Sequence, residues 1–215
     1  VSLRYEFTKW LYLQGRVNAD FGYNNNEANY PHGVGVPLRN STNTGWVGSY
    51  NVATSFGRQL NMDFLLGTAN KIGDFTVNAS VGGNRFTVNN NNTFQSVTDF
   101  VVKDIYSLGN GLTKNQNNFS IYRTQVNSLY AFADLSYKDF LYLNVTDRID
   151  YFSVLTPPSS IVANPKNSFN YYSVGVSFIF SEFLPSISWL DYGKLRGTYA
   201  TSGNANGVSP FSSQL

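Results

Sequence analysis

The sequence predicts an all-β fold: a transmembrane, antiparallel, up-and-down β-barrel to which this chain contributes about eight strands. Three observations predict it. Apolar and polar residues alternate along most segments, no apolar stretch reaches the roughly 18 residues of a transmembrane helix, and the connections between segments are short and long in turn. Mean hydropathy is mildly negative, at -0.23. A barrel tolerates this value because it sorts apolar and polar residues onto opposite faces.

The composition fits this fold and excludes several function classes. A chain of 215 residues suits one all-β domain, and its Tyr and Phe residues are typical of strands. The net charge of +2 is too small to indicate a nucleic-acid partner. Cysteine is absent, which excludes a disulfide framework, a thiolate nucleophile and a cysteine metal site.

The first two expected strands are Ser2 to Thr8, which is short, and Leu11 to Tyr23. In the second, apolar residues occupy one face, and Arg16 and Asp20 lie on the other with two polar neighbours. Its length exceeds the roughly 9 to 11 residues with which a tilted strand crosses a membrane. Because charged side chains are costly in a dry core, one face is expected to meet water and the other lipid.

The third expected strand, Val47 to Asn70, is unusually long and contains Phe56-Gly57-Arg58 near its middle. This interruption is interpreted as a bulge rather than a hairpin turn, because a turn there would place a long connection on the rim of short ones. In the second half of the strand, Asp63 is expected to face the lumen. The fourth strand, Asp74 to Thr87, repeats the alternation.

Four more strands complete the expected set: Arg123 to Tyr137, Phe140 to Tyr151, Asn170 to Phe180, and Tyr192 to Thr201. In the second of these, Leu141, Leu143 and Val145 oppose a polar face that includes Arg148. Arg148 and Asp150 share a face, and an ion pair on a lumen wall is a plainer interpretation of them than acid–base catalysis.

The connections alternate in length and thereby define two rims. Short turns lie at 8–10, 70–73 and 138–139, a moderate one at 181–191, and long loops at Asn24 to Trp46, Val88 to Tyr122 and Phe152 to Phe169. Aromatic residues near both rims are expected to form two girdles at the membrane interfaces. They are Trp10, Phe75, Tyr137, Phe140, Trp189 and Tyr192 beside the short turns, and Phe21, Tyr23, Phe86, Tyr151, Phe152, Tyr171 and Tyr172 beside the long loops.

Residues with catalytic or ligating chemistry are sparse. His32 is the only histidine and is interpreted as a solvated loop residue. The runs Asn24 to Asn26 and Asn89 to Asn92 are interpreted as loop filler. No catalytic residue, cofactor or metal site is expected. The candidate site residues are therefore those expected to face the lumen: Arg16, Asp20, Asp63, Arg148, Asp150 and Arg196.

Several segments resemble one family in order along the chain. The segments at 59–66 and 73–84 resemble the paired-strand region of SusC-like TonB-dependent transporters of Bacteroidetes, and those at 128–139, 142–150 and 194–204 resemble later strands of the same barrel. The resemblance implies a barrel of about 22 strands, of which residues 1–215 are one part. The family's plug domain, TonB box and closing C-terminal strands are not visible in this chain.

The resemblance also implies a function and partners. A SusC-like barrel imports an oligomeric nutrient, a glycan or a peptide, across the bacterial outer membrane without catalysis, energised by TonB through the plug. A SusD-like surface lipoprotein would sit on the long-loop rim, where the loops Asn24 to Trp46 and Val88 to Tyr122 are expected to contact it, and membrane lipid would surround the wall.

Two alternatives remain open at this stage. In the first alternative to the transporter, the strands form a complete small outer-membrane barrel with a structural or adhesive role. In the second, they form a soluble carbohydrate-binding β-sandwich whose apolar faces meet in a core. A small barrel requires its first and last strands to pair, and a sandwich requires a second sheet.

Overall fold

A computed structural model describes residues 1–31, 48–155, 167–183 and 190–203. It contains eight strands and two short 3-10 helices, η1 (Ser153–Leu155) and η2 (Phe180–Phe183). The strands are β1 (Ser2–Glu6), β2 (Leu11–Tyr30), β3 (Ser49–Ile72), β4 (Phe75–Phe100), β5 (Gly111–Tyr137), β6 (Leu141–Phe152), β7 (Ser168–Ile179) and β8 (Lys194–Ala200). Within these ranges, neither helix is long and apolar enough to cross a membrane.

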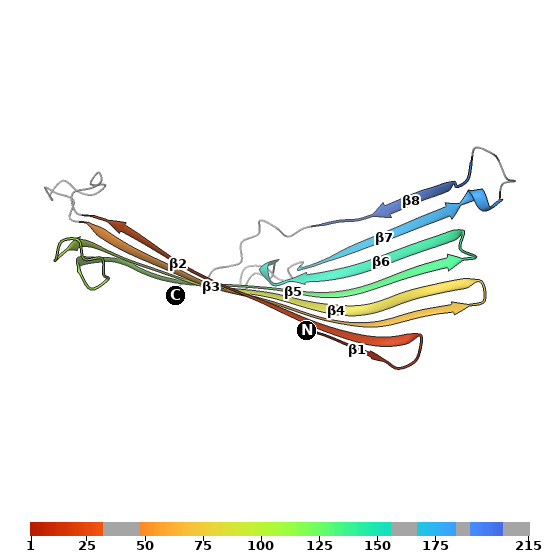
Figure 1. The fold of residues 1–215 in the computed structure, drawn as a ribbon, viewed down its shortest axis with the longest axis horizontal. Helices are drawn as coiled ribbons and strands as arrows, with labels where there is room; N and C mark the ends of the chain where they lie inside the picture. The colour runs from red at the N-terminus through yellow and green to blue at the C-terminus, as the bar shows by residue number, and fades with distance from the viewer. Residues whose placement is uncertain (32–47, 156–166, 184–189, 204–215) are drawn as a thin grey trace. The chain divides into compact units, whose positions relative to one another are not determined.

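The eight strands form one sheet in which every strand pairs with its neighbour in sequence, from β1 to β8 (Figure 1). The pairs β1–β2, β5–β6, β6–β7 and β7–β8 are antiparallel. This order confirms the all-β, up-and-down fold that the sequence predicts. In the described part of the chain β1 and β8 are the two edges and do not pair with each other, so the sheet is open.

The chain divides into two compact units, and each is described by itself. Unit 1 is built from Val1–Ala19, Leu60–Thr87 and the described part of Thr124–Phe211, and it contains parts of all eight strands. The described part of unit 2 consists of residues within Asp20–Gln59 and Val88–Arg123, which are the remaining parts of β2, β3, β4 and β5.

In unit 1 the strand register sorts side chains onto two faces. Tyr130 on β5 lies opposite Arg148 on β6, and Thr146 on β6 lies opposite Ser173 on β7. Opposite residues share a face of a sheet, so these define one polar face. Val145 lies opposite Ala133 and Val174, which defines the other, apolar face. The predicted alternation therefore holds across strands and not only along them.

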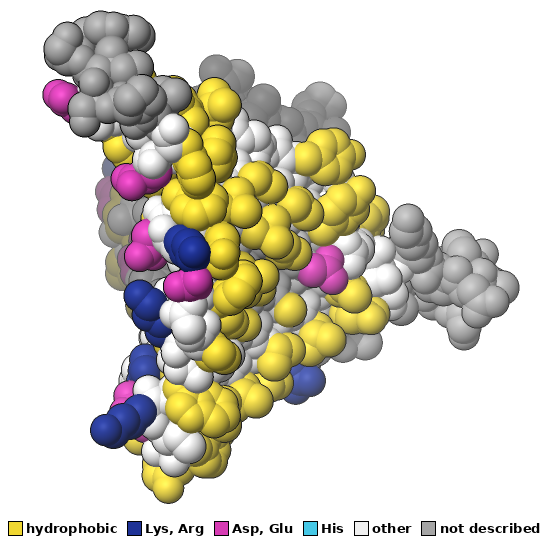
Figure 2. Space-filling model, turned by 90° about the vertical axis from the view of Figure 1, so that its right-hand side faces the viewer, with side chains coloured by type: hydrophobic (Ala, Val, Ile, Leu, Met, Phe, Trp, Pro, Cys, Tyr) yellow, Lys and Arg dark blue, Asp and Glu magenta, His cyan; other side chains and the backbone are white. Residues whose placement is uncertain are grey.

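The apolar face of unit 1 has no protein layer over it among the described residues. The buried hydrophobic residues of the described chain are Val97 and Phe100, both in unit 2. On the apolar face, by contrast, Phe64 is 57% exposed and Val176 is 45% exposed. Figure 2 shows hydrophobic side chains gathered over a broad surface, with most of the visible charged side chains along one side of it.

This exposure argues against the β-sandwich alternative. A sandwich would bury these side chains against a second sheet. The described residues instead form a single sheet whose apolar side chains are left without a covering layer. Monomeric soluble proteins rarely expose an apolar surface of this extent.

Unit 2 corrects the prediction of a long loop at Val88 to Tyr122. Strands β4 and β5 continue through most of this segment and are joined by a turn at 101–110. The side chain of Asn110 closes the turn, because its amide nitrogen donates to the carbonyl oxygens of Val102 at 2.7 Å and Ile105 at 2.6 Å. Loop prediction failed here because hydrogen bonds between polar side chains on neighbouring strands stabilise strands in a polar segment.

The two asparagine runs were also predicted wrongly as loop filler, since they lie in β2 and β4. Asn92 accepts a hydrogen bond at 2.7 Å from the Ser55 hydroxyl on β3, and Thr93 pairs with Thr54. Asn25 donates to Glu27 at 3.2 Å on β2. Such side-chain bonds compensate for the weak strand preference of Asn.

Other boundaries differ by smaller amounts. β2 extends to Tyr30 rather than ending at Tyr23, and β3 is one continuous strand, as expected, so the hairpin interpretation is wrong. The bulge at Gly57 stays a prediction. His32 and Trp189 lie outside the described residues, as does most of the predicted loop Asn24 to Trp46.

Candidate functional site

The six candidate residues lie on four strands. Arg16 is on β2, Asp63 on β3, Arg148 and Asp150 on β6, and Arg196 on β8. In unit 1 the register places Arg196 opposite Ser177, which in turn lies opposite Tyr142 on the face of Arg148. Asp20 belongs to unit 2 and has the same parity on β2 as Arg16. That this polar face lines a lumen stays a proposal.

Arg16 and Asp63 form a two-pronged ion pair between β2 and β3. The Arg16 Nε donates to Asp63 Oδ1 at 2.8 Å and the Nη2 donates to Oδ2 at 2.7 Å. The Asp63 side chain is 13% exposed, whereas that of Arg16 is 50% exposed. The carboxylate is therefore held against the sheet, and the guanidinium covers it on the open side.

Tyr130 extends this pair from β3 to β5. Its hydroxyl donates to Asp63 Oδ2 at 3.2 Å, although β4 runs between the two strands. The ring passes over Gly82 on β4, where an added Cβ would lie 2.7 Å from Tyr130 Cζ. The same Cβ would lie even closer to the backbone carbonyl oxygen of Phe64 on β3, so glycine is required at this position both by the neighbouring backbone and by the ring.

A second ion pair follows on β6. The Arg148 Nε donates to Asp150 Oδ1 at 2.6 Å, and its Nη2 donates to the Ser128 hydroxyl on β5 at 2.9 Å. The side chain of Asp150 is 12% exposed and that of Arg148 is 45% exposed. The predicted ion pair between these two residues is therefore present, with the same division into a covered carboxylate and an open guanidinium.

Together these residues make a polar belt that spans unit 1 from β2 to β6, with members on β2, β3, β5 and β6 and with Tyr130 opposite Arg148. The polar belt is defined as Arg16, Asp63, Tyr130, Ser128, Arg148 and Asp150. Sequence analysis missed Tyr130 and Ser128. The sequence signal for both is their position on the polar face of β5. Tyr130 lies opposite Arg148, and Ser128 lies opposite Asp150.

All belt residues except Ser128 line a concave surface of about 770 Å³, which we call the polar hollow. Besides belt residues, its lining includes Gln14, Asn61 and Asn84, together with the aromatic rings of Phe86, Phe132 and Phe152. Phe86 and Phe152 were predicted to belong to the long-loop girdle. This prediction is wrong for both, because Phe86 and Phe152 lie on the polar face, where they line the same hollow as Arg16 and Arg148.

The short-turn rim carries a connected group of aromatic rings. Phe75 lies 4.8 Å from Tyr137 between ring centroids, Tyr137 lies 5.5 Å from Phe140, and Phe140 lies 4.7 Å from Phe183 on η2. At the same rim the Asp74 Oδ2 atom lies 3.5 Å from the Lys138 Nζ atom. The nearby carboxylate raises the pKa of Lys138. Phe75, Tyr137 and Phe140 are three of the residues predicted to form the aromatic girdle beside the short turns.

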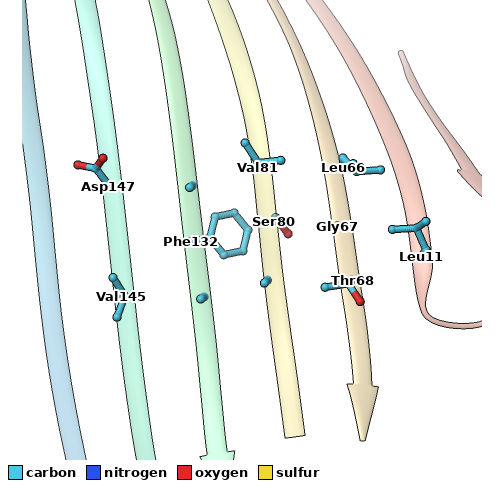
Figure 3. A pocket seen from close by; sticks show the side chains of 12 residues that line it. Leu11, Leu66, Gly67, Thr68, Ser80, Val81, Phe132, Val145 and Asp147 are labelled. Carbon is cyan, nitrogen blue, oxygen red and sulfur yellow. The ribbon is translucent and has the colours of Figure 1, made fainter. Parts of the chain in front are cut away.

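The apolar face of β6 carries one carboxylate, that of Asp147. Asp147 lies opposite Ala131 and Tyr172, on the same face as Val145. It lines an apolar hollow of about 400 Å³ (Figure 3), whose lining also includes Val81 and Leu66. The alternation therefore has a charged exception near the middle of β6.

The site offers binding chemistry. Among the described residues no group of three or more His, Asp or Glu side chains is placed to hold a metal ion. The polar belt presents guanidinium, hydroxyl and amide groups beside aromatic rings. These groups bind and orient polar ligands through hydrogen bonds.

Comparison with known proteins identifies the fold. No protein family and no curated protein matches the sequence. The solved structure of the RagAB peptide transporter is similar, with a TM-score of 0.79 and 16% identity over 96% of this chain and 22% of that chain. The RagAB peptide importer in its open-open state has a TM-score of 0.77 and 17% identity. This match covers 92% of this chain and 21% of that chain.

The closed-closed state of the same importer gives a TM-score of 0.79 and 16% identity, over 96% of this chain and 22% of that one. This chain thus spans about a fifth of the length of the structures it matches. At this identity the likeness concerns the fold. The chain has the fold of a segment of a β-barrel transporter, which confirms at that level the resemblance to SusC-like transporters drawn from the sequence.

Proposed function

We propose that this chain is part of the wall of a bacterial outer-membrane nutrient importer of the SusC-like, TonB-dependent type. The apolar face contacts lipid, and the polar face with Arg16, Asp20, Asp63, Arg148, Asp150 and Arg196 lines the lumen. A plug domain elsewhere in the protein gates the lumen, and TonB supplies the energy.

One observation carries this proposal. Unit 1 is a sheet with a broad uncovered apolar face and an opposite face that holds two hydrogen-bonded ion pairs. Water on both sides would leave the apolar face unstable, and protein on both sides would require a partner sheet. Lipid on one side and an aqueous lumen on the other satisfy both faces.

The fold comparison favours an oligopeptide as the substrate. The similar structures are described as a peptide transporter and a peptide importer, and a glycan remains the other class that SusC-like barrels carry. A SusD-like surface lipoprotein would cap the rim that bears the β4–β5 hairpin. The open edges of β1 and β8 support a larger barrel over a closed eight-stranded one, because they do not pair in the described chain.

The proposal is tested with the full-length protein in its native membrane. Fractionation is expected to place the protein in the outer membrane, and uptake of a fluorescent oligopeptide mixture is expected to require both the protein and TonB. Deleting TonB while keeping the protein in the membrane is the control for passive leakage.

Two results would contradict the proposal. Recovery of the full-length protein in a soluble fraction without detergent would exclude a membrane wall. Peptide and glycan uptake that is unchanged when the gene is deleted would exclude an import role, even if the protein lies in the outer membrane.

A further inference from the structure

The two arginines of the polar belt are held in the same way. A guanidinium has a side edge, formed by Nε and one Nη, and an end edge formed by the two Nη groups. In Arg16 the side edge is occupied by Asp63, and in Arg148 it is occupied by Asp150 and Ser128. Among the described residues no hydrogen bond is made by the Nη1 group of either arginine, and the Tyr130 hydroxyl also interacts with Arg16.

Burial gives the belt an uneven surface charge. The two carboxylates are 12% and 13% exposed, whereas the guanidiniums are 45% and 50% exposed. The negative charges therefore lie against the sheet, and the positive charges lie toward the polar hollow. A ligand that enters the hollow meets guanidinium N–H donors before it meets carboxylate oxygens.

The end edge of a guanidinium matches a carboxylate, because two parallel N–H donors meet two oxygen acceptors. Both arginines line the polar hollow, together with Phe86, Phe132 and Phe152. The hollow thus combines carboxylate-binding donors with aromatic surface. Acidic peptides with apolar side chains carry both complementary features, whereas neutral glycans lack the carboxylate.

We propose that the polar hollow is a substrate site selective for acidic oligopeptides, in which Arg16 and Arg148 bind peptide carboxylates through the end edges of their guanidiniums. This inference rests on the proposed import function. Tyr130 positions Asp63, and Asp63 in turn fixes the orientation of Arg16.

The test compares two short peptides on the purified full-length protein with its partner lipoprotein. Both consist of Gly, Ala and Phe with two added residues, either Glu or Gln, and both have blocked ends. The wild-type protein is expected to bind the Glu peptide about tenfold more tightly, the factor that one charge-assisted hydrogen-bond pair supplies. Arg148→Lys keeps the charge but loses the end edge, and it is expected to remove most of this preference.

Arg196→Lys is the matched control, because Arg196 lies on the polar face but does not line the hollow. It is expected to keep the Glu preference. The ratio of the two affinities is measured on each variant separately, so a loss of folded protein does not change it. A third probe, a Gln peptide with a free C-terminus, distinguishes a side-chain carboxylate from a terminal one as the preferred group.

Two outcomes would overturn the inference while leaving the import function intact. One is equal binding of Glu and Gln peptides to the wild type. The other is a Glu preference that Arg148→Lys and Arg16→Lys leave unchanged, which would locate carboxylate binding in another part of the protein. Peptide and glycan uptake that does not depend on the protein would instead contradict the proposed function itself.

Discussion

The Tyr130 hydroxyl on β5 donates a hydrogen bond at 3.2 Å to the Asp63 carboxylate on β3, across the strand that separates them. Gly82 on β4 leaves room for this ring and for the Phe64 carbonyl oxygen of β3. Gly67 has the corresponding role on β3, where an added Cβ would meet the ring of Tyr12 on β2. Glycines on the polar face thus let tyrosine rings lie across neighbouring strands.

This relationship gives the first prediction. Gly82→Val places a branched side chain against the Phe64 carbonyl oxygen and the Tyr130 ring, and it is expected to lower the free energy of unfolding by about 1–3 kcal/mol, as overpacking does. Urea unfolding of the full-length protein in lipid vesicles measures the change. Gly15→Val is the control, because a Cβ at Gly15 has no heavy atom within 4 Å. Equal effects of the two substitutions would contradict the packing role of Gly82.

The second prediction concerns the strength of the Arg16–Asp63 pair. A double-mutant cycle with Arg16→Met and Asp63→Asn is expected to give a coupling free energy of about 1 kcal/mol, reduced from that of a buried pair because Arg16 is half exposed. The comparison pair is Arg4–Glu6, at 3.2 Å with both side chains at least half exposed.

The Arg4–Glu6 cycle, with Arg4→Met and Glu6→Gln, is expected to give a coupling below about 0.5 kcal/mol, as is usual for surface pairs. Both cycles use the same unfolding measurement in lipid vesicles. A coupling at Arg16–Asp63 no larger than at Arg4–Glu6 would show that the two-pronged geometry adds nothing to stability.

The third prediction tests which face meets water. The chain has no cysteine, so single cysteines can be introduced without a background signal. Gln14→Cys and Arg196→Cys, on the polar face, are expected to react with a membrane-impermeant thiol reagent in outer-membrane vesicles. Leu13→Cys and Leu195→Cys, one residue away on the apolar face, are expected to be protected by lipid. Similar labelling within each neighbouring pair would contradict the face assignment.

The fourth prediction uses two aspartates on one strand. Asp147 lies on the apolar face of β6 and Asp150 lies on its polar face, where it pairs with Arg148. Asp147→Leu is expected to raise the free energy of unfolding in lipid by about 0.5–2 kcal/mol, because a carboxylate facing hydrocarbon is unfavourable.

Asp150→Leu is expected to have the opposite effect, lowering the free energy of unfolding by about 1–2 kcal/mol, because it leaves the half-exposed Arg148 without its carboxylate. The same vesicle assay measures both variants. Stabilisation by both, or by neither, would show that the two faces of β6 do not meet different surroundings.

The sequence by itself determined the number and up-and-down order of the strands, and the shared polar face of Arg16, Asp63, Arg148, Asp150 and Arg196 in unit 1. Period-two alternation is a local property, because successive side chains point to opposite sides of any strand. Residues 11–23 therefore carry enough information to separate Arg16 from Val17. The same local pattern predicted the shared face of Arg148 and Asp150.

Only the tertiary structure decided which groups meet. The partner of Arg16 is Asp63, on another strand, and their contact depends on the register between β2 and β3, which no local pattern specifies. The contact of Tyr130 with Asp63 further depends on a glycine in the intervening strand. The hairpin at 88–122 extends for a similar reason, since cross-strand bonds between distant residues, such as Ser55 with Asn92, offset the weak strand preference of its sequence.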